Sequence, residues 1–577
     1  MNRLSIEIRT SPTPLVLKAA ELLEREVSER TGVTVDESGR GSIVLDIRPG
    51  VGTEGFVIED SPGDAVAIIG ADERGLIYGV GKFLRTSRYE DGDFIPSAWR
   101  GTSVPRRSVR GIYFASHFFN FYHAAPIDRI QRYVEELALW GCNALVVWFD
   151  MHHFNGIADP AAKEMIQRLR AILQAANAVG ISGAIGALAN EGYADSPESL
   201  RADWTAGHDG YTTPPGGHYH CEVCPSTDGG LDYILDTRRE MLDAFQDLDI
   251  RYVWIWPYDQ GGCTCAKCAP WGANGFLKCA RPLAAVIRSV LPKAEIILST
   301  WYFDKFTLGE WEGLTWAMGR QKPDYADYLI ADDYGDIFPS YPLEHGVPGG
   351  LPLLNFPEIS MYNMWPWGGY GANPMPAHLQ RLWDSCDEHL AGGFPYSEGI
   401  FEDLNKAISL QHYWGDRPAM DTLREYANWV ASPDAVDDVV AAVEIMEEQH
   451  TRGTRPFEEL VTLTRDQIFP PAGGGSEAPL FVPTAWPRSA ECLRLVQKAE
   501  TRMSAHDRQA WRWRLIRLRA QIDADMQRTH GHNDAVSDAL FDEVEAISCV
   551  QMGVHFLSAP NRRMFVRCFI ENTPGPM

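Results

Sequence analysis

A strand, a helix and a second strand are predicted within VRGIYFASHFFNFYHAAPIDRIQRYVEELALWGCNALVVWF, residues 109–149. Its two ends are short and mostly apolar, which is typical of strands buried on both faces of a parallel sheet. Between them, IDRIQRYVEELALWG has the apolar spacing of an amphipathic helix and ends at Gly141. The stretch therefore predicts one βα unit.

The same alternation of apolar runs and amphipathic helices continues toward residue 410. Eight strands at this spacing predict an α/β fold of the (β/α)8 TIM-barrel type. A doubly wound sheet is the alternative, but no G-x-G-x-x-G follows the first strand, and the chain contains no P-loop sequence. The predicted strands are VRGIYFA (109–115), NALVVWF (143–149), ISGAIGALA (181–189), RYVWIWP (251–257), AEIILSTWY (294–302), DYLIADD (327–333), LPLLNF (351–356) and GGFPYSE (392–398).

The regions on either side of the predicted barrel have different patterns. Residues 1–105 alternate short strands with two helices, as expected for a small α/β domain. Residues 106–410 hold the barrel. Residues 411–577 carry almost only helical patterns, so we expect an α-helical C-terminal domain there.

Composition excludes several kinds of partner. The 577 residues carry 52 Lys+Arg against 78 Asp+Glu, a net charge of −26, which would repel nucleic acid and anionic membranes. The N-terminus has no apolar signal region, and no segment reaches the ~20 apolar residues of a membrane helix. We expect a cytoplasmic protein without an organic cofactor, and the helical tail offers a surface for a homodimer.

Carboxylates and aromatic residues follow nearly every predicted strand. Catalytic groups of such barrels lie at the carboxyl ends of the strands, and a charge leaving an apolar strand is costly unless it is used or paired. A mouth lined with acids, Trp and Tyr, without a cofactor motif, favours cleavage of glycosidic bonds. Each acid taken alone could equally be a helix cap or a salt-bridge partner.

Four segments resemble known glycosidases. AIIGADERGLIYGVGKFLR (67–85) and VPRRSVRGIYF (104–114) resemble the small domain and barrel entry of β-hexosaminidases and family 67 α-glucuronidases. WPYDQGGCTCAKC (256–268) and FPYSEGIFEDLNK (394–406) resemble the family 163 endo-β-N-acetylglucosaminidases. The resemblance covers residues 1–410 and implies a glycoside hydrolase.

The catalytic residues carry over only in part. The β-hexosaminidases have an Asp-Glu pair after strand four, whereas this chain has Asp259-Gln260. The α-glucuronidases pair an acid on strand four with carboxylates on strands six and seven, and this pattern implies inversion of the anomeric centre. We predict Glu358 and Asp259 as the central catalytic pair, with Asp333 and Glu398 as reserves. Glu358 precedes an aromatic loop, and such a low-dielectric setting would hold it protonated.

A further set is expected to bind the substrate, by ring stacking or by hydrogen bonds to sugar hydroxyls. For each Trp, packing in the barrel or its loops is at least an equal expectation. The adjacent His152 and His153 would point apart on an extended chain, which argues against a metal centre. The predicted set is His117, Trp148, His152, Glu191, Tyr258, Trp301, Asp332, Trp365 and Trp367.

Five cysteines form the most specific local motif. Two C-x₂-C pairs, which begin at Cys221 and Cys265, have the spacing of tetrahedral zinc sites. We expect a structural zinc that joins the loops after strands three and four; the C-x-C-x₂-C run resembles the zinc site of family 42 β-galactosidases. Cys263 could replace Cys221 or Cys224 among the ligands. Buried free thiols and disulfides are the alternatives to zinc. The candidate ligands are Cys221, Cys224, Cys263, Cys265 and Cys268.

The leading hypothesis is a glycoside hydrolase that acts on the ends of small oligosaccharides or glycosides, with an N-acetylhexosaminide favoured over a uronide. An inverting α-glycosidase of the α-glucuronidase type and a non-catalytic carbohydrate-binding protein are the alternatives. A zinc hydrolase or deaminase would need an open metal site with His ligands, and the all-cysteine spacing argues against it.

Overall fold

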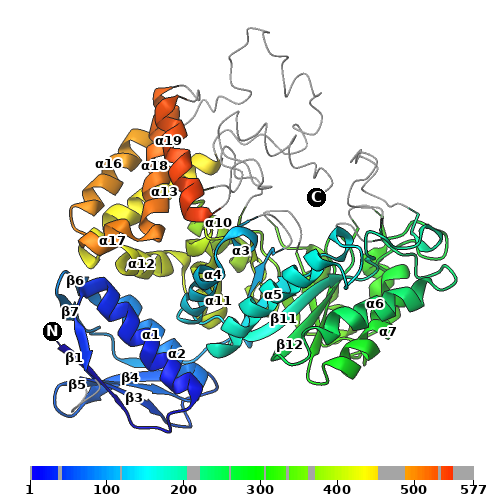
Figure 1. The fold of residues 1–577 in the computed structure, drawn as a ribbon, viewed down its shortest axis with the longest axis horizontal. Helices are drawn as coiled ribbons and strands as arrows, with labels where there is room; N and C mark the ends of the chain where they lie inside the picture. Colours follow the sequence, from blue (N-terminus) through cyan, green and yellow to red (C-terminus); the bar gives the residue numbers. More distant parts are fainter. Residues whose placement is uncertain are drawn as a thin grey trace.

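The structure is a computed structural model with three parts (Figure 1). A small sheet with two helices lies at the lower left, a helical bundle lies above it, and the barrel fills the right-hand side. The described residues are 3–36, 42–116, 120–203, 221–258, 262–304, 307–332, 337–360, 371–451, 488–529 and 534–549.

The N-terminal part is a six-stranded mixed sheet with the order β2-β1-β3-β5-β4-β8. Helices α1 (Pro14–Thr31) and α2 (Glu73–Thr86) cover one face of it. The Thr13 side chain caps α1 and Asp72 caps α2 by accepting from backbone N–H groups of the first turn. The strands are β1 (Arg3–Ile8), β2 (Thr34–Asp36), β3 (Ile43–Ile47), β4 (Phe56–Ser61), β5 (Ala65–Gly70) and β8 (Gly101–Ser103), and a hairpin of β6 (Arg88–Glu90) and β7 (Asp93–Ile95) follows α2.

The second sheet is a closed parallel barrel, as predicted. It closes because β10 pairs with β11 on one side and with β9 on the other. Each of the eight predicted strands is present, and the last one is split into two segments around Phe394 and Pro395, both of which pair with β9. The strands are β9 (Val109–Phe114), β10 (Ala144–Trp148), β11 (Ser182–Leu188), β12 (Ile250–Trp256), β13 (Glu295–Ser299), β14 (Tyr328–Ala331), β15 (Leu353–Asn355), β16 (Leu390–Gly393) and β17 (Tyr396–Ser397).

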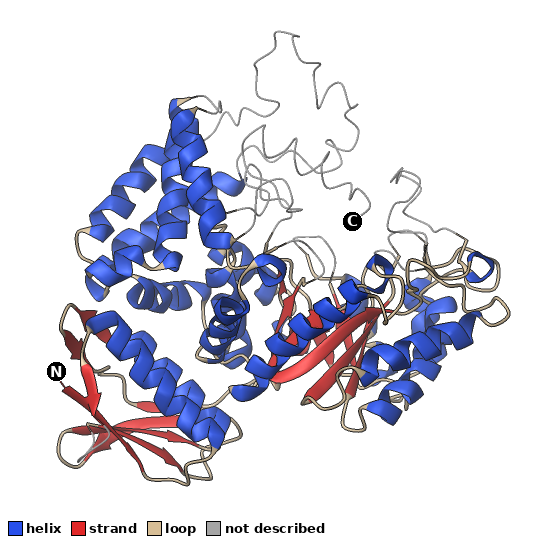
Figure 2. Cartoon of the chain, in the orientation of Figure 1, coloured by secondary structure: helices blue, strands red, loops and turns tan. Residues whose placement is uncertain are grey.

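Helices connect the strands and surround the barrel (Figure 2). The first of them, α4, buries an apolar face that includes Ile130, Val134 and Leu137, as its spacing predicts. The connecting helices are α3 (Phe121–Ala124), α4 (Ile127–Ala138), α5 (Pro160–Ala178), α6 (Gly230–Asp243), α7 (Gly275–Val290), α8 (Glu310–Met318), α9 (Ser340–His345), α10 (Pro376–Asp384) and α11 (Asp403–Gly415), with 3₁₀ turns η1 (Met151–His153), η2 (Glu198–Leu200), η3 (Pro348–Gly350) and η4 (Asp387–His389).

Aromatic rings fill the barrel interior. Trp254 stacks on Trp256 with ring centroids 5.6 Å apart, and Tyr113 stacks on Trp254 at the same separation. Gly186 makes room for this layer, since a side chain there would begin 2.5 Å from the Trp148 ring. The barrel is therefore a packed core with an aromatic layer beneath its mouth.

The described residues of the C-terminal part form helices, as predicted for this region. Its α18 is amphipathic and buries Trp513 completely. Helix α11, which begins the region, completes the eighth βα unit of the barrel and extends to Gly415. The other helices are α12 (Ala419–Val430), α13 (Val436–Thr451), α16 (Ser489–Glu500), α17 (Ala505–Gln509), α18 (Trp511–Arg528) and α19 (Ala535–Ser548), with the 3₁₀ turn η5 (Pro433–Ala435).

Buried ion pairs join the three parts. Glu425 of α12 pairs with Lys82 at 2.5 Å and with Arg85 at 2.9 Å, both from α2, and with Arg417 at 2.6 Å. Burial disfavours the charged carboxylate, but the three cations outweigh burial and lower the pKa of Glu425. Glu425 thus connects the N-terminal sheet to the C-terminal helices.

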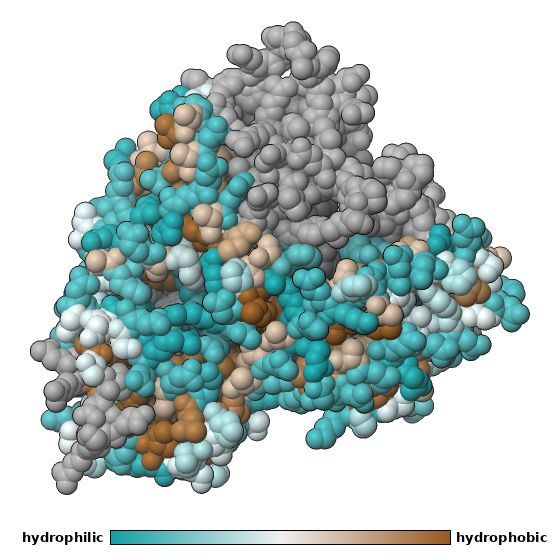
Figure 3. All heavy atoms as spheres, in the orientation of Figure 1, coloured by the Kyte–Doolittle hydropathy of each residue, from teal (hydrophilic) through white to brown (hydrophobic). Residues whose placement is uncertain are grey.

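The described surface on the face shown in Figure 3 is mostly hydrophilic, with an apolar group at the lower left over the N-terminal sheet. No helix within the described ranges is long and apolar enough to cross a membrane.

Candidate active site at the barrel mouth

Two glutamates follow the seventh and eighth strands of the barrel. Glu358 comes after β15 and forms an isolated parallel bridge with Tyr396 of β17. Its Oε1 atom accepts hydrogen bonds from the N and Oγ atoms of Ser360, at 2.8 and 2.6 Å. Glu358 is 8% exposed, whereas Glu398, just past β17, is fully buried.

Glu398 is held by two neutral donors. The Tyr396 hydroxyl donates to its Oε1 atom, and Asn120 Nδ2 donates to its Oε2 atom at 3.1 Å. Asn120 is in turn fixed by Ala115 O at 2.7 Å, at the end of the first barrel strand. We call Glu358, Tyr396, Glu398 and Asn120 the glutamate pair group.

Burial and charge repulsion keep a proton on this group. Burial raises the pKa of Glu398 to about 8, and the negative charge of Glu358 adds to the increase, although the hydrogen bonds from Tyr396 and Asn120 oppose it. At neutral pH Glu398 is therefore mostly protonated, in contrast to an exposed glutamate. The sequence predicts a protonated carboxyl at Glu358, and the structure shows a raised pKa at its neighbour Glu398.

A second group of acids follows strands β10 and β11. His152 Nδ1 lies 2.7 Å from Asp150 Oδ1 and 3.0 Å from Glu191 Oε1. The His152 backbone N–H also donates to Glu191 Oε1 at 3.2 Å. All three side chains are at least 95% buried. We call Asp150, His152 and Glu191 the histidine group.

The turn that carries the histidines corrects one expectation from the sequence. Met151–His153 is a 3₁₀ turn rather than extended chain. The rings of His152 and His153 therefore lie side by side, with centroids 4.4 Å apart, and both face Asp150. These ligand atoms lie within 4.8 Å of one another, so Asp150, His152 and His153 could hold a metal ion.

Charge is divided unevenly within the histidine group. Burial alone would lower the pKa of His152, but Asp150 and Glu191 outweigh burial and raise it well above its usual value. Burial and the charge of Glu191 raise the pKa of Asp150, whereas the hydrogen bond and charge of His152 outweigh burial at Glu191 and lower its pKa. Nearby, burial raises the pKa of Glu222 to about 8.

A third acidic site, formed around Glu310, lies beyond strands β12 and β13. The Tyr258 hydroxyl donates to Glu310 Oε1, and the backbone N–H of Gly272 donates to the same atom at 2.8 Å. Asp304 N donates to Glu310 Oε2 at 3.1 Å. Burial raises the pKa of Glu310 to about 6, against these hydrogen bonds. Tyr258 thus positions an acid from the next loop.

The other predicted binding residues are part of the packed mouth. Trp148 contacts Trp256 edge-on at 6.3 Å, and Trp301 lies 5.6 Å from Trp256. Both Trp148 and Trp301 are 4% exposed, so their contacts are those of core residues. Asp332 is buried and accepts from Phe356 N at 3.1 Å, which ties the ends of β14 and β15 together.

Some predicted residues lie outside the described part of the chain. The roles assigned to them from the sequence stay predictions. They are His117, Asp259, Asp333, Trp365 and Trp367.

Several functional neighbours were missed by sequence reasoning. Tyr396 stands two residues before Glu398, and the period of two in a strand would have placed both on one face. Asn120 caps the short α3 and Glu310 begins α8 after Gly309, so no strand end indicated them. Glu222 lies in a loop directly after Cys221, away from any predicted strand end.

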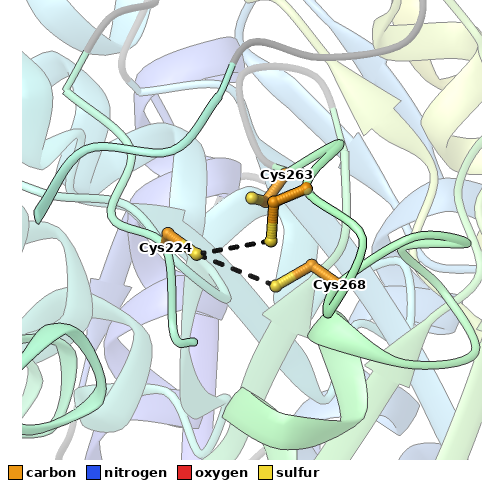
Figure 4. Close-up of side chains that lie close together, drawn as sticks. Cys224, Cys263 and Cys268 are labelled. Carbon is orange, nitrogen blue, oxygen red and sulfur yellow. Dashed lines mark hydrogen bonds between the residues drawn. The ribbon is translucent and has the colours of Figure 1, made fainter. Parts of the chain in front are cut away.

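Four of the five candidate cysteines converge beside the mouth. The sulfur atoms of Cys224, Cys263, Cys265 and Cys268 lie within 4.8 Å of one another. Figure 4 shows Cys224 facing Cys263 and Cys268 from a different loop. Cys221 is not a member of this group; its carbonyl oxygen accepts from Ser196 Oγ at 3.0 Å. Of the two replacements that the sequence leaves open, Cys263 in place of Cys221 and Cys263 in place of Cys224, the positions of the sulfur atoms favour the first.

Several solved structures share this fold. A family GH115 4-O-methyl-α-glucuronidase with specificity for decorated arabinogalactans has a TM-score of 0.61 at 13% identity, over 94% of this chain and 76% of that one. CpGH89 from Clostridium perfringens, in complex with its substrate GlcNAc-α-1,4-galactose, has a TM-score of 0.59 at 12% identity, over 92% and 65%. A glycoside hydrolase family 20 β-N-acetylglucosaminidase has a TM-score of 0.51 at 15% identity, over 76% and 93%.

No protein-family model and no curated protein sequence matches the chain. The expected resemblance to barrel glycoside hydrolases is confirmed at the level of the fold. The three structures compared belong to families other than 163 and 67, so those two assignments are not supported.

Proposed function

We propose that the chain is a glycoside hydrolase whose bond-cleaving carboxyl groups lie at the barrel mouth. The observation that carries this proposal is the glutamate pair group. Two glutamates from neighbouring strands interact there, and one of them keeps its proton at neutral pH. Glycosidic cleavage needs both a protonated carboxyl and a group that stabilises or attacks the cationic anomeric centre.

The exposures of the two glutamates favour different roles. Glu358 keeps 8% of its surface exposed and is assigned as the carboxyl that meets the sugar. Glu398 is fully buried and acts as a positioning residue that holds a proton next to Glu358. Tyr396 connects them, since its hydroxyl donates to Glu398 while its backbone pairs with Glu358. Asp259, assigned from the sequence alone, is proposed as the second catalytic carboxyl.

The aromatic layer beneath the mouth supports the same chemistry. Trp256 and Phe356 pack with centroids 5.0 Å apart, and Tyr396 lies 5.7 Å from Phe356. Such a floor excludes water from below, which strengthens electrostatic interactions with a developing oxocarbenium ion. A sugar bound above it would meet Glu358 from the apolar side.

An N-acetylhexosaminide at the end of a short oligosaccharide or glycoside is the proposed substrate. Two of the structures with the same fold are described by their action on N-acetylglucosamine glycosides, one with an α linkage and one as a β-enzyme. The glucuronidase among them makes an α-glucuronide the second substrate to test.

A panel of aryl glycosides tests the proposal. We expect turnover of an α- or β-N-acetylglucosaminide, and proton NMR of the first product identifies the anomer released. Glu358→Gln removes the carboxylate at nearly constant shape and should lower kcat/KM by about 10²–10⁴-fold. Glu344→Gln is the matched control, because the Glu344 side chain is 67% exposed on α9.

Two results would contradict the proposal. One is wild-type turnover that Glu358→Gln leaves unchanged. The other is a chain that binds sugars without cleaving any member of the panel and keeps its affinity in Glu358→Gln, which would make it a carbohydrate-binding protein.

A further inference from the structure

The cysteine group, defined as Cys224, Cys263, Cys265 and Cys268, is not used by the proposed reaction. Its members come from two loops, Cys224 after β11 and the other three after β12. Cys224, Cys263 and Cys268 are buried and Cys265 is partly exposed. Three buried thiols and a partly exposed one that face one another need an explanation, because thiols are weak hydrogen-bond donors and weak acceptors for one another.

The distances within the group are those of a metal site. The Sγ atom of Cys224 lies 3.8 Å from that of Cys265 and 3.9 Å from that of Cys268. Four sulfurs around a zinc ion at about 2.3 Å form a tetrahedron with edges of about 3.8 Å. A disulfide would require about 2.0 Å between two sulfurs. The spacing therefore fits one central ion better than a pair of disulfides.

The backbone of the second loop is already shaped to present its thiols. Cys268 N donates to Cys265 O at 2.9 Å, and Ala269 N donates to the same oxygen at 3.0 Å. This tight turn points the two sulfurs of Cys265 and Cys268 to the same side, as in a zinc knuckle. Ser226 Oγ, from the first loop, lies 3.2 Å from Cys268 Sγ.

One asparagine side chain holds the two loops together. Asn190 Nδ2 donates to Val223 O at 3.1 Å and to Gly262 O at 2.8 Å, and Asn190 Oδ1 accepts from Gly262 N at 2.9 Å. Val223 directly precedes Cys224, and Gly262 directly precedes Cys263. The Asn190 bridge therefore fixes the relative position of the first and second loops at the residues that enter the cysteine group.

We propose that Cys224, Cys263, Cys265 and Cys268 bind one zinc ion, with Cys221 excluded from the ligand set. Four thiolates fill a tetrahedral shell, so the ion has no open position and is structural. It joins the loop after β11, which follows Glu191, to the loop after β12, which follows Tyr258. The zinc thereby supports two walls of the candidate active site without entering the reaction.

Metal analysis of the full chain, purified under reducing conditions without chelator, tests this site. We expect one zinc per chain in the wild type and a severalfold loss in Cys224→Ser and in Cys268→Ser. Cys221→Ser is the matched control, because Cys221 belongs to the same C-x₂-C motif but stands outside the group. It should keep the full zinc content, as should Cys279→Ser, which replaces another buried cysteine.

A second measurement covers the case in which a ligand variant fails to fold. The wild-type chain is stripped with a chelator and reloaded with Co²⁺, whose absorption spectrum reports the number of thiolate ligands and tetrahedral geometry. We expect a four-thiolate tetrahedral spectrum that stoichiometric Zn²⁺ abolishes, and a lower Tm for the stripped chain. This readout does not depend on glycosidase activity.

The outcomes divide as follows. Zinc lost from Cys221→Ser as fully as from Cys224→Ser would overturn the ligand set. A wild type without zinc that binds no Co²⁺, or one in which mass spectrometry of native peptides finds disulfides among these four cysteines, would overturn the site itself. A wild type that carries iron in these four cysteines would overturn the assignment of zinc.

Discussion

Two groups of buried acids occupy the same barrel mouth and differ in one respect. In the histidine group, His152 lies within 3.0 Å of both carboxylates, so positive charge is present. In the glutamate pair group, the donors to Glu398 are the neutral Tyr396 and Asn120. Glu191 and Glu398 are similarly buried, yet the pKa of Glu191 is lowered and that of Glu398 is raised. Asp150, which shares His152 with Glu191, keeps a raised pKa, so the cation favours the charged form of one of its two acids.

The difference shows that burial raises the free energy of an ionised carboxylate, and that the neighbouring side chain decides whether this free energy is compensated. A cation such as His152 forms ion pairs with buried carboxylates, and such ion pairs can fix the conformation of the loops at the barrel mouth. Neutral donors leave a proton on the carboxyl near pH 7, which is suited to acid catalysis or to its support.

The largest effect is expected for His152→Gln. The change removes the positive charge between Asp150 and Glu191 and leaves Arg238 as a remaining cation that favours ionised Glu191. The loss of this buried partner should lower the free energy of unfolding by about 3–5 kcal/mol. Urea denaturation at pH 7 measures it. The control is His153→Gln, because the His153 side chain is 20% exposed and lies 3.5 Å from Asp150. Equal losses in the two variants would show that His152 carries no special charge role.

A smaller effect, confined to pH dependence, is expected for Glu398→Gln. Folded Glu398 keeps its proton up to about pH 8, whereas an unfolded glutamate loses it near pH 4.3. Between these values the folded state binds more protons, so wild-type stability falls as pH rises, by about 1.4 kcal/mol per pH unit from this group.

Glu398→Gln cannot titrate and should remove this part of the slope. Denaturation curves between pH 5 and pH 8 measure the slope, with Glu344→Gln as the exposed control. A dependence of stability on pH equal to that of the wild type would mean that Glu398 is ionised in the folded protein. The glutamate pair group and the histidine group would then both hold an ionised glutamate.

The smallest effect is expected for Tyr258→Phe. Glu310 resembles Glu398 in having only neutral donors among the contacts described above, and Tyr258→Phe removes one of them. Stability should fall by about 1 kcal/mol, and the pKa of Glu310 should rise further above 6. Tyr325→Phe is the control, since the Tyr325 hydroxyl has no hydrogen-bond partner among the described residues. A larger loss than for His152→Gln would contradict the ranking of charge above neutral hydrogen bonds.

The sequence predicted the barrel because strands buried on both faces are almost continuously apolar. NALVVWF and RYVWIWP correspond to β10 and β12 within a residue at each end. The split of the last strand depends on Pro395, which cannot donate a backbone hydrogen bond, and on how far β9 extends beside it. That second condition is a property of the tertiary structure.

The sequence predicted which acidic residues lie at the barrel mouth, but not which side chains they contact there. Glu358, Glu398 and Glu191 follow their strands as the barrel rule requires. Their partners could not be predicted, because the 3₁₀ turn that brings His152 to Asp150 depends on loop conformation. For the same reason the sequence offered Cys263 as a replacement for Cys221 or Cys224 without deciding between them. Loop conformations follow from long-range packing, which a single sequence does not display.

The ion pairs of Glu425 with α2 have a consequence for attempts to shorten the protein. Two of the three cations that neutralise this acid, Lys82 and Arg85, belong to helix α2 of the N-terminal part, and Arg417 alone comes from the C-terminal part. A shortened chain that begins after residue 105 would keep the acid and lose both α2 cations, and it would expose the surface on which α2 rests. We therefore expect the N-terminal part to be needed for the stability of the other two parts, so that it cannot be removed or exchanged without loss.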